Sequence, residues 1–164
     1  MSAASPQGAR PAEKISIDFA TVADLEAMAD LLAELFTLES DFSPEREQQL
    51  RGLRLILQTP SSGRLFVLRA GDQVAGMANA LLTISTAEGC PVLLLEDVIV
   101  KAAWRGRQLG RQLVEHVFDW ARAAGITRVT LLADQDNAPA LAFYERVGFC
   151  RSNMRVLRLN LRRD

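Results

Sequence analysis

The chain has 164 residues, of which 49% are hydrophobic and 24% charged, so it is long enough to close one substantial core and has the composition of an ordinary globular protein. A formal net charge of −1 lacks the strongly basic balance of nucleic-acid-binding proteins, so we expect no nucleic-acid partner. No apolar run approaches the about 20 residues that span a bilayer, and residues 1–13 lack the apolar core of a signal peptide. These patterns predict no membrane partner and a cytoplasmic location.

The organisation of the chain is predicted to be simple. Residues 1–13 are expected to form a disordered N-terminal arm, and residues 14–164 a single domain. Cys90 and Cys150 are too few for a disulfide framework and have no metal-ligand spacing, so we expect a reduced protein without a metal. Charge is uneven, with eight acidic residues and one basic residue over 21–50, and six basic and two acidic residues over 101–128. One region should therefore favour cations and the other anions.

The first half of the chain alternates between strand and helix signals. Apolar periodicity, capping residues and turn residues predict, in chain order, a strand over 14–20, a helix after Asp24, a second helix capped by Ser43 and started by Pro44, and strands over 64–70 and 73–86. Gly71 and Asp72 supply a two-residue hairpin signal between the last two strands. This half therefore predicts a sheet with at least one antiparallel hairpin.

The second half predicts a crossover. Residues 91–100 are apolar nearly throughout, which is typical of a central strand. A turn rich in Gly and Arg then leads into a helix over about 109–124, which Gly125 ends. A strand over 127–133, a short helix containing Tyr144 and a final alternating strand over 155–161 complete the pattern. The order of elements predicts one α/β domain, with a mixed sheet and helices on both faces.

The turn WRGRQLGRQL, residues 104–113, carries the first functional signal. A helix start presents unpaired backbone N–H groups and the positive end of the helix dipole, so it attracts phosphate. Gly106 and Gly110 allow a ligand to approach the backbone closely, and Arg105, Arg107 and Arg111 add positive charge. An ordinary loop with solvated arginines explains these residues equally well.

Two stretches resemble motifs of the GNAT superfamily of N-acetyltransferases. EDVIVKAAWRGRQLGRQL is similar to motif A, Arg/Gln-x-x-Gly-x-Gly/Ala: Arg105 and Gly110 match, and Gln108 replaces the usual first glycine, which is tolerable if that residue is already helical. NAPALAFYERVGF resembles motif B, Asn-x-x-Ala-x-x-Phe-Tyr-x-x-x-Gly-Phe, with matches at Asn137, Ala140, Phe143, Tyr144, Gly148 and Phe149. The resemblance implies the GNAT fold, a central mixed, mostly antiparallel sheet with splayed central strands and helices on both faces.

The resemblance also implies acetyl-CoA as the cosubstrate and direct acetyl transfer to an amine. In similar proteins the strand before motif A is bulged, and the pantetheine arm pairs with its free backbone groups as an added strand. The pyrophosphate would lie on the backbone N–H groups of the turn. The cofactor contacts implied are Val98, Ile99, Val100, Arg105, Gly106, Arg107, Gln108, Leu109, Gly110, Arg111, Asn137, Ala140 and Tyr144.

Glu96 and Tyr144 are the candidate catalytic residues. Glu96 interrupts an apolar strand just before the expected pantetheine site, where it would take the proton of the amine. A glutamate that only decorates the bulge is the alternative, and Asp97 is a second candidate base. The resemblance assigns oxyanion stabilisation to the backbone N–H of Val98. It also implies that Tyr144, the single tyrosine, protonates or hydrogen-bonds the departing CoA sulfur; a core tyrosine is the alternative.

The segment between the first two helices carries the acceptor hypothesis. Glu39 and Asp41 would attract an ammonium group, and Phe36 and Phe42 would pack its carbon stem or offer a cation–π face. A small, cationic amine is therefore expected, although a solvated acidic surface explains the same residues. A protein or peptide acceptor and a CoA-binding sensor without useful transfer remain alternatives. A homodimer is expected only from the resemblance.

Overall fold

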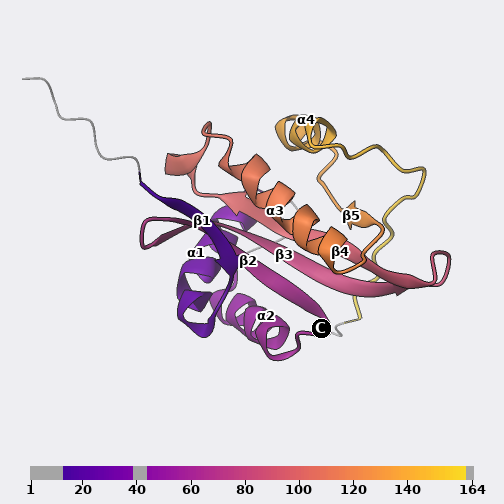
Figure 1. The fold of residues 1–164 in the computed structure, drawn as a ribbon, viewed down its shortest axis with the longest axis horizontal. Coiled ribbons are helices and arrows are strands. Elements are labelled where there is room, and N and C mark those ends of the chain that lie inside the picture. The colour runs from indigo at the N-terminus through magenta and orange to yellow at the C-terminus, as the bar shows by residue number, and fades with distance from the viewer. Residues whose placement is uncertain (1–12, 39–43, 162–164) are drawn as a thin grey trace, which may run out of the picture.

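The computed structural model describes residues 13–38 and 44–161. Its elements form a five-stranded sheet, in the order β1-β2-β3-β4-β5, with helices on both faces (Figure 1). The elements are β1 Ile15–Phe19, η1 Val22–Asp24, α1 Leu25–Phe36, α2 Arg46–Gln58, β2 Gly63–Ala70, β3 Gln73–Ser85, β4 Cys90–Val100, η2 Ala102–Trp104, α3 Leu109–Ala123, β5 Val129–Leu131 and α4 Ala138–Arg146.

The sheet is mixed, as the sequence predicts. Strands β1 to β4 pair as antiparallel neighbours, and β5 pairs with β4 in parallel. A parallel pair needs a crossover, and α3 supplies it. The hairpin predicted at Gly71 and Asp72 joins β2 to β3.

Two cores lie on opposite faces of the sheet. Successive side chains of a strand point to opposite faces, so Phe66 and Leu68 of β2 pack with α3, whereas Leu65 and Val67 pack with α1 and α2. Figure 1 shows α3 on one face and α1 and α2 on the other. The helices on the two faces bury most of the middle of the sheet, including Phe66, Leu68, Met77 and Leu93.

The end of the chain departs from the prediction. The strand predicted over 155–161 is wrong, because residues 150–161 belong to no helix or strand. Leu157, Leu159 and Leu161 are 93%, 81% and 83% exposed. An alternating segment becomes a strand only when a neighbouring strand satisfies its backbone groups, and none of the described strands pairs with it.

Two element boundaries also differ. Strand β5 ends at Leu131 instead of Ala133, because β4 no longer pairs with it beyond that point. Helix α2 begins at Arg46 instead of Pro44, since Glu45 has non-helical φ and ψ of −128° and 85°. The predicted cap Ser43 lies outside the described residues.

Candidate active site

Among the described strands, the second half of β4 pairs with one neighbour, β3, on one edge only. Parallel pairing with β5 covers only Leu93 to Leu95, whereas antiparallel pairing with β3 continues to Val100. Strands β4 and β5 therefore separate after Leu95. The edge of β4 that faces away from β3 is open from there to the end of the strand.

The backbone groups on this open edge can be identified. The N–H of Lys101 donates to the carbonyl of Ala75 in β3 at 2.8 Å. Because backbone groups alternate in direction along a strand, those of Val98 and Val100 point to the other edge. Arg105 shows this direction directly, since its Nε donates to the Val100 carbonyl at 2.8 Å. The open edge can accept an added strand, with the Val100 carbonyl already in use.

A β-bulge interrupts β4 beside the open edge. The register with β3 shifts between Met77 and Asn79, so that Asp97 and Val98 lie opposite the single residue Ala78. Asp97 has a φ of 51°, in the left-handed region that residues other than glycine seldom adopt.

The bulge reverses the faces of the strand. Leu95 packs in the core beneath α3, whereas Ile99, four residues later, packs in the core beneath α1 and α2. In a regular strand these two positions would share a face. The extra residue therefore turns the strand over at the point where its open edge begins.

Three polar side chains meet at the bulge. Met77 packs in the core beneath α1 and α2. Asn79 lies two residues later in β3, so its side chain points to the same face of the sheet. Glu96 is its direct partner across the strands. The Asn79 Nδ2 donates to Oδ2 of Asp97 at 3.2 Å. Asn79 is only 4% exposed, and its Oδ1 accepts no hydrogen bond within the described part of the chain.

Both carboxyl groups hold their protons more tightly than exposed carboxyls do. Burial raises the pKa of Glu96, the nearby charge of Asp97 raises it further, and Arg158 partly opposes them. Burial also raises the pKa of Asp97, and the hydrogen bond from Asn79 offsets part of that increase. A base with a raised pKa is better matched to proton transfer near neutral pH.

The predicted phosphate turn begins α3 in the expected manner. Its first bond into the helix runs from the Gln112 N–H to the Gln108 carbonyl at 3.1 Å, so the N–H groups before it have no helical acceptor. Gly106 has a φ of 75°. Gln108 is exposed and left-handed, with a φ of 59°. From the sequence, we expect a side chain to be tolerated at position 108 if that residue is already helical. Gln108 is not helical, so this condition is not met.

The three arginines of the turn have protein partners. Arg105 donates through Nη2 to Oε1 of Glu34 in α1 at 2.5 Å, and the same carboxylate accepts the Ala102 N–H at 3.2 Å. Arg111 pairs with Glu115 at 2.7 Å. Arg107 lies over the Trp104 ring, 4.8 Å from its centroid.

Glu34 thus links α1 to the turn through Arg105 and Ala102. Sequence reasoning missed this residue, because 71 positions separate it from Arg105 and no motif contains it.

The tyrosine helix lies against the same turn. A Cβ added at Gly110 would be 3.7 Å from the Phe143 ring, which places α4 beside the start of α3. The Tyr144 ring contacts those of Phe143 and Phe149, with centroids 5.1 and 5.7 Å away. Asn137 caps α4, since its Oδ1 accepts the Ala140 N–H at 3.1 Å. The cap leaves the Nδ2 of Asn137 available as a donor.

Comparison with known proteins identifies this arrangement. The model of the acetyltransferase (GNAT) family matches residues 25–149, most of the chain and all of the site described above. This chain belongs to the GNAT acetyltransferase family. Members of the family use acetyl-CoA.

Similar proteins have different names and acceptors. N-alpha-acetyltransferase RimI of Mycobacterium tuberculosis is 31% identical over 145 residues, 87% of this chain and 83% of that protein. Streptothricin acetyltransferase of Streptomyces lavendulae is 34% identical over 90 residues, 54% of this chain. This chain covers only 46% of that protein. A predicted acetyltransferase from Clostridium acetobutylicum, solved with acetyl-CoA, shares the fold at 14% identity, with a TM-score of 0.72 and coverage of 90% and 97%.

The acceptor side of this GNAT domain is only partly described. Phe36, the last residue of α1, packs against the core beneath α1 and α2. The other three predicted acceptor residues, Glu39, Asp41 and Phe42, lie outside the described residues. Within residues 13–38 and 44–161, no cluster of three His, Cys, Asp or Glu side chains could hold a metal ion. No helix of these two ranges is long and apolar enough to cross a membrane.

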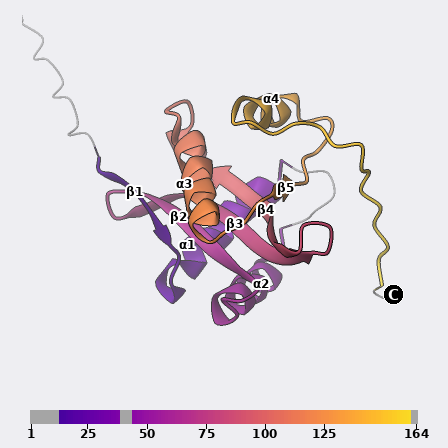
Figure 2. The ribbon, with the colours of Figure 1, turned by 45° about the vertical axis from the view of Figure 1, so that its right-hand side comes forward.

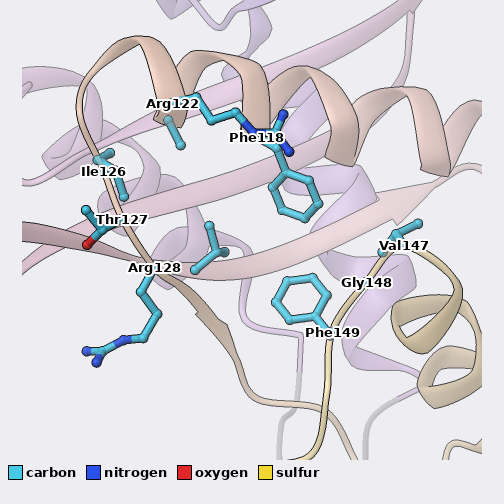
Figure 3. Close-up of a pocket in the computed structure, with 10 residues that line it drawn as sticks. Phe118, Arg122, Ile126, Thr127, Arg128, Val147, Gly148 and Phe149 are labelled. Carbon is cyan, nitrogen blue, oxygen red and sulfur yellow. The ribbon is translucent and has the colours of Figure 1, made fainter.

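A hollow of about 380 Å³ is separate from the predicted catalytic, cofactor and acceptor residues. It is bounded by the C-terminal half of α3, the start of β5 and residues 147–149 (Figure 3). Phe118 and Phe149 line it from opposite elements, with ring centroids 5.7 Å apart. None of the predicted catalytic, cofactor or acceptor residues lines this hollow.

Proposed function

We propose that this protein transfers the acetyl group of acetyl-CoA directly to a primary amine while both substrates are bound. The observation that carries the proposal is the open edge of β4 beyond Leu95, beside a turn whose backbone N–H groups have no helical acceptor. One chain segment thereby offers a strand edge for the pantetheine arm and a helix start for the pyrophosphate.

The cofactor would follow that edge toward α3. The carbonyl of Val98 and the N–H of Val100 would pair with the pantetheine amides, because the Val100 carbonyl already accepts from Arg105 and the Val98 N–H is assigned to the oxyanion. The pyrophosphate would lie on the N–H groups between Gly106 and Arg111. Helix α4 would cover the arm, with the Asn137 Nδ2 as a donor and Ala140 as a small contact surface.

Glu96 is the proposed general base. An alkyl ammonium has a pKa of about 10.4, so its deprotonation near pH 7 costs roughly 4 to 5 kcal/mol. Burial raises the pKa of Glu96 and brings it closer to neutrality, which makes the carboxylate a better proton acceptor. Its position opposite Asn79, just before the bulge, places it beside the open edge.

The transfer step balances with two side chains and one backbone donor. Glu96 first takes a proton from the bound ammonium, directly or through water, and releases it to solvent. The neutral amine nitrogen then bonds to the acetyl carbon and loses its second proton to Glu96. The oxyanion of the tetrahedral intermediate accepts the Val98 N–H. When the C–S bond breaks, Tyr144 gives its phenolic proton to the thiolate and regains one from solvent.

A small cationic amine is the proposed acceptor. Residues 21–50 contain eight acidic residues and one basic residue, which supports a preference for cations. Four of the eight, Asp24, Glu26, Asp30 and Glu34, pair with arginines, so the support comes from the other four. The name of streptothricin acetyltransferase indicates a small-molecule acceptor, whereas that of N-alpha-acetyltransferase RimI indicates an α-amino group. The chemistry proposed for Glu96, Val98 and Tyr144 is the same for both acceptor classes.

Release of the CoA thiol, measured over amines, polyamines, amino acids, aminoglycosides and short peptides, tests the activity and selects the acceptor class. With an acceptor found, Tyr144→Phe should lower kcat about 10²-fold or more and leave the Kd for CoA nearly unchanged. Glu145→Gln, an exposed substitution beside it, is the matched control. Wild-type kcat in Tyr144→Phe would exclude the phenol as the acid. CoA binding without release above amine-free hydrolysis, with every acceptor class, would instead favour a sensor.

A further inference from the structure

The buried contact between Asn79 and Asp97 has no place in the acetyl-transfer steps above. Its two residues lie on neighbouring strands, 18 positions apart, and meet directly at the bulge. The neighbours of Asn79 along β3, Met77, Ala78 and Ala80, are fully buried and apolar. An amide among them needs an explanation.

An asparagine at position 79 would be unfavourable for the stability of the fold if packing were the only requirement. Its Oδ1 is buried without a described hydrogen-bond donor, and a buried polar atom without a partner destabilises the fold. An apolar residue of similar size would avoid that cost. Within the described residues the Asn79 side chain makes one hydrogen bond, to Asp97. That bond is therefore the reason to look for a function of Asn79.

The hydrogen bond from Asn79 holds the residue with the most unusual backbone conformation in β4, Asp97. Asp97 is left-handed, and it is one of the two residues that lie opposite a single residue of β3. If residue 97 returned to an extended conformation, the extra residue would no longer fit there, and the register would shift for the residues after it. The Val98 N–H would then leave the open edge.

We propose that Asn79 and Asp97 form a positioning pair, in which the Asn79 amide holds the Asp97 carboxyl and thereby keeps the bulge that aims Glu96 at the acceptor and the Val98 N–H at the acetyl carbonyl. The inference rests on the proposed acetyl transfer for its kinetic consequences, but its structural consequence does not. Neither residue needs to touch a reacting atom, because each acts through the backbone at residues 96 to 98.

Asn79→Leu is the first test, because it keeps the approximate volume and removes the amide. We expect a folded protein, a higher Kd for acetyl-CoA because the backbone groups of Val98 and Val100 no longer face the open edge, and a kcat lowered about 10²-fold by misplacement of the reacting groups. Thr83→Leu, an exposed position on the same face of β3, is the matched control and should keep its kcat. Wild-type kcat in Asn79→Leu would overturn the proposal.

A series at Asp97 separates positioning from proton transfer. Asp97→Asn keeps a polar group and a residue type that tolerates left-handed φ, so it should lose far less kcat than Asp97→Ala. Asp97→Gly, which allows the conformation without the side chain, should fall between them. Equal losses in Asp97→Asn and Asp97→Ala would assign the carboxylate itself to the chemistry and overturn the positioning assignment.

A crystal structure of Asn79→Leu decides the matter independently of activity. The proposal requires that residue 97 leave the left-handed region or that the β3–β4 register change. An unchanged bulge in that variant would overturn it, even if acetyl transfer were confirmed. A shifted bulge would support it even if no acceptor were found, so its failure and that of the proposed function are distinguishable.

Discussion

The layers around β2, β3 and β4 and the part of the chain that follows α3 are packed very differently. Phe66, Met77 and Leu113 are fully buried in the first region. In the second region α4 contains no buried residue, β5 has three residues, and residues 150–161 expose their leucines. Figure 2 shows α4 and the segment after it on the outer side of the sheet, away from α1 and α2.

The proposed chemistry is divided between these two regions. Glu96 and the Val98 N–H belong to the rigid strand β4, and Tyr144 and Asn137 belong to the weakly buried helix α4. Catalysis requires all four in one geometry. The proposed base and oxyanion donor therefore lie within the densely packed layers, whereas the proposed acid lies on a helix without buried residues, which a bound cofactor would contact.

The largest expected effect compares one substitution in the two regions. Leu113→Ala, at a side chain with 0% exposure, should lower the free energy of unfolding by about 2 to 5 kcal/mol. Leu157→Ala, at 93% exposure, should change it by less than about 0.5 kcal/mol. Urea unfolding of both variants measures the difference. A loss of several kcal/mol in Leu157→Ala would show that residues 154–161 pack in solution.

Cofactor binding should reduce the contrast between α4 and α3. A helix without buried side chains opens readily, and a ligand at 100 times its Kd stabilises the binding-competent form by about 2.7 kcal/mol. Hydrogen exchange of α4 amides should therefore slow by up to about a hundredfold with saturating CoA. The amides of α3 around Val114 and Val117, already fully buried, serve as the internal control. Equal slowing in both helices would mean that α4 is as well held as α3 without cofactor.

Within the packed region, two aspartates with little exposure should respond to pH with opposite signs. For Asp24, burial raises the pKa, but hydrogen bonds from Arg69 and Thr21 and the Arg69 charge outweigh it, and the pKa is lowered. Its stabilisation is present above the ordinary value of 3.8 and is lost as pH falls through the folded-state pKa. For Asp97, burial raises the pKa, so its contribution is complete below 3.8 and is lost as pH rises through the folded-state pKa.

Variants at the two positions check these signs. At pH 7, Asp24→Asn should be less stable than the wild type, and Asp97→Asn more stable. The Asp24→Asn difference should shrink as the pH falls below 3.8 through the lowered folded-state pKa of Asp24. The Asp97→Asn difference should shrink at higher pH, as the pH falls through the raised folded-state pKa of Asp97 toward 3.8. Urea unfolding from pH 3 to 8 provides the measurement. A stability difference for Asp97→Asn that stayed constant over this range would contradict the raised pKa.

Prediction from sequence succeeded where local pattern and tertiary packing agree. The apolar spacing of α1 and the long apolar strand β4 each describe a surface that the fold buries. The turn residues Gly71 and Asp72 join β2 and β3, which pair as antiparallel neighbours. Residues 155–161 have an equally clear alternation and form no strand. Alternation records which side chains share a face, but it does not supply the neighbouring strand that pairing requires.

Within the site, motifs located single segments but not the contacts between them. The resemblance identified the turn before α3 and the helix containing Tyr144, because each lies within one short stretch. It could not reveal that Glu34 holds Arg105, or that Asn79 holds Asp97, since 71 and 18 positions separate these pairs. Such contacts depend on how the sheet and α1 bring distant segments together, and no local periodicity encodes them.

The smallest expected effect concerns the turn before α3, beside which α4 packs. Gln108 is left-handed with a φ of 59°, a conformation that costs an L-residue roughly 1 kcal/mol and glycine almost nothing. Gln108→Gly should therefore raise the free energy of unfolding by up to about 1 kcal/mol, less the entropy that glycine adds to the unfolded chain. Gln112→Gly, one turn later and inside α3, should lower it by about 1 kcal/mol. Opposite signs for the same substitution, measured by urea unfolding, would confirm the left-handed turn, and equal losses would show that α3 begins before Gln108.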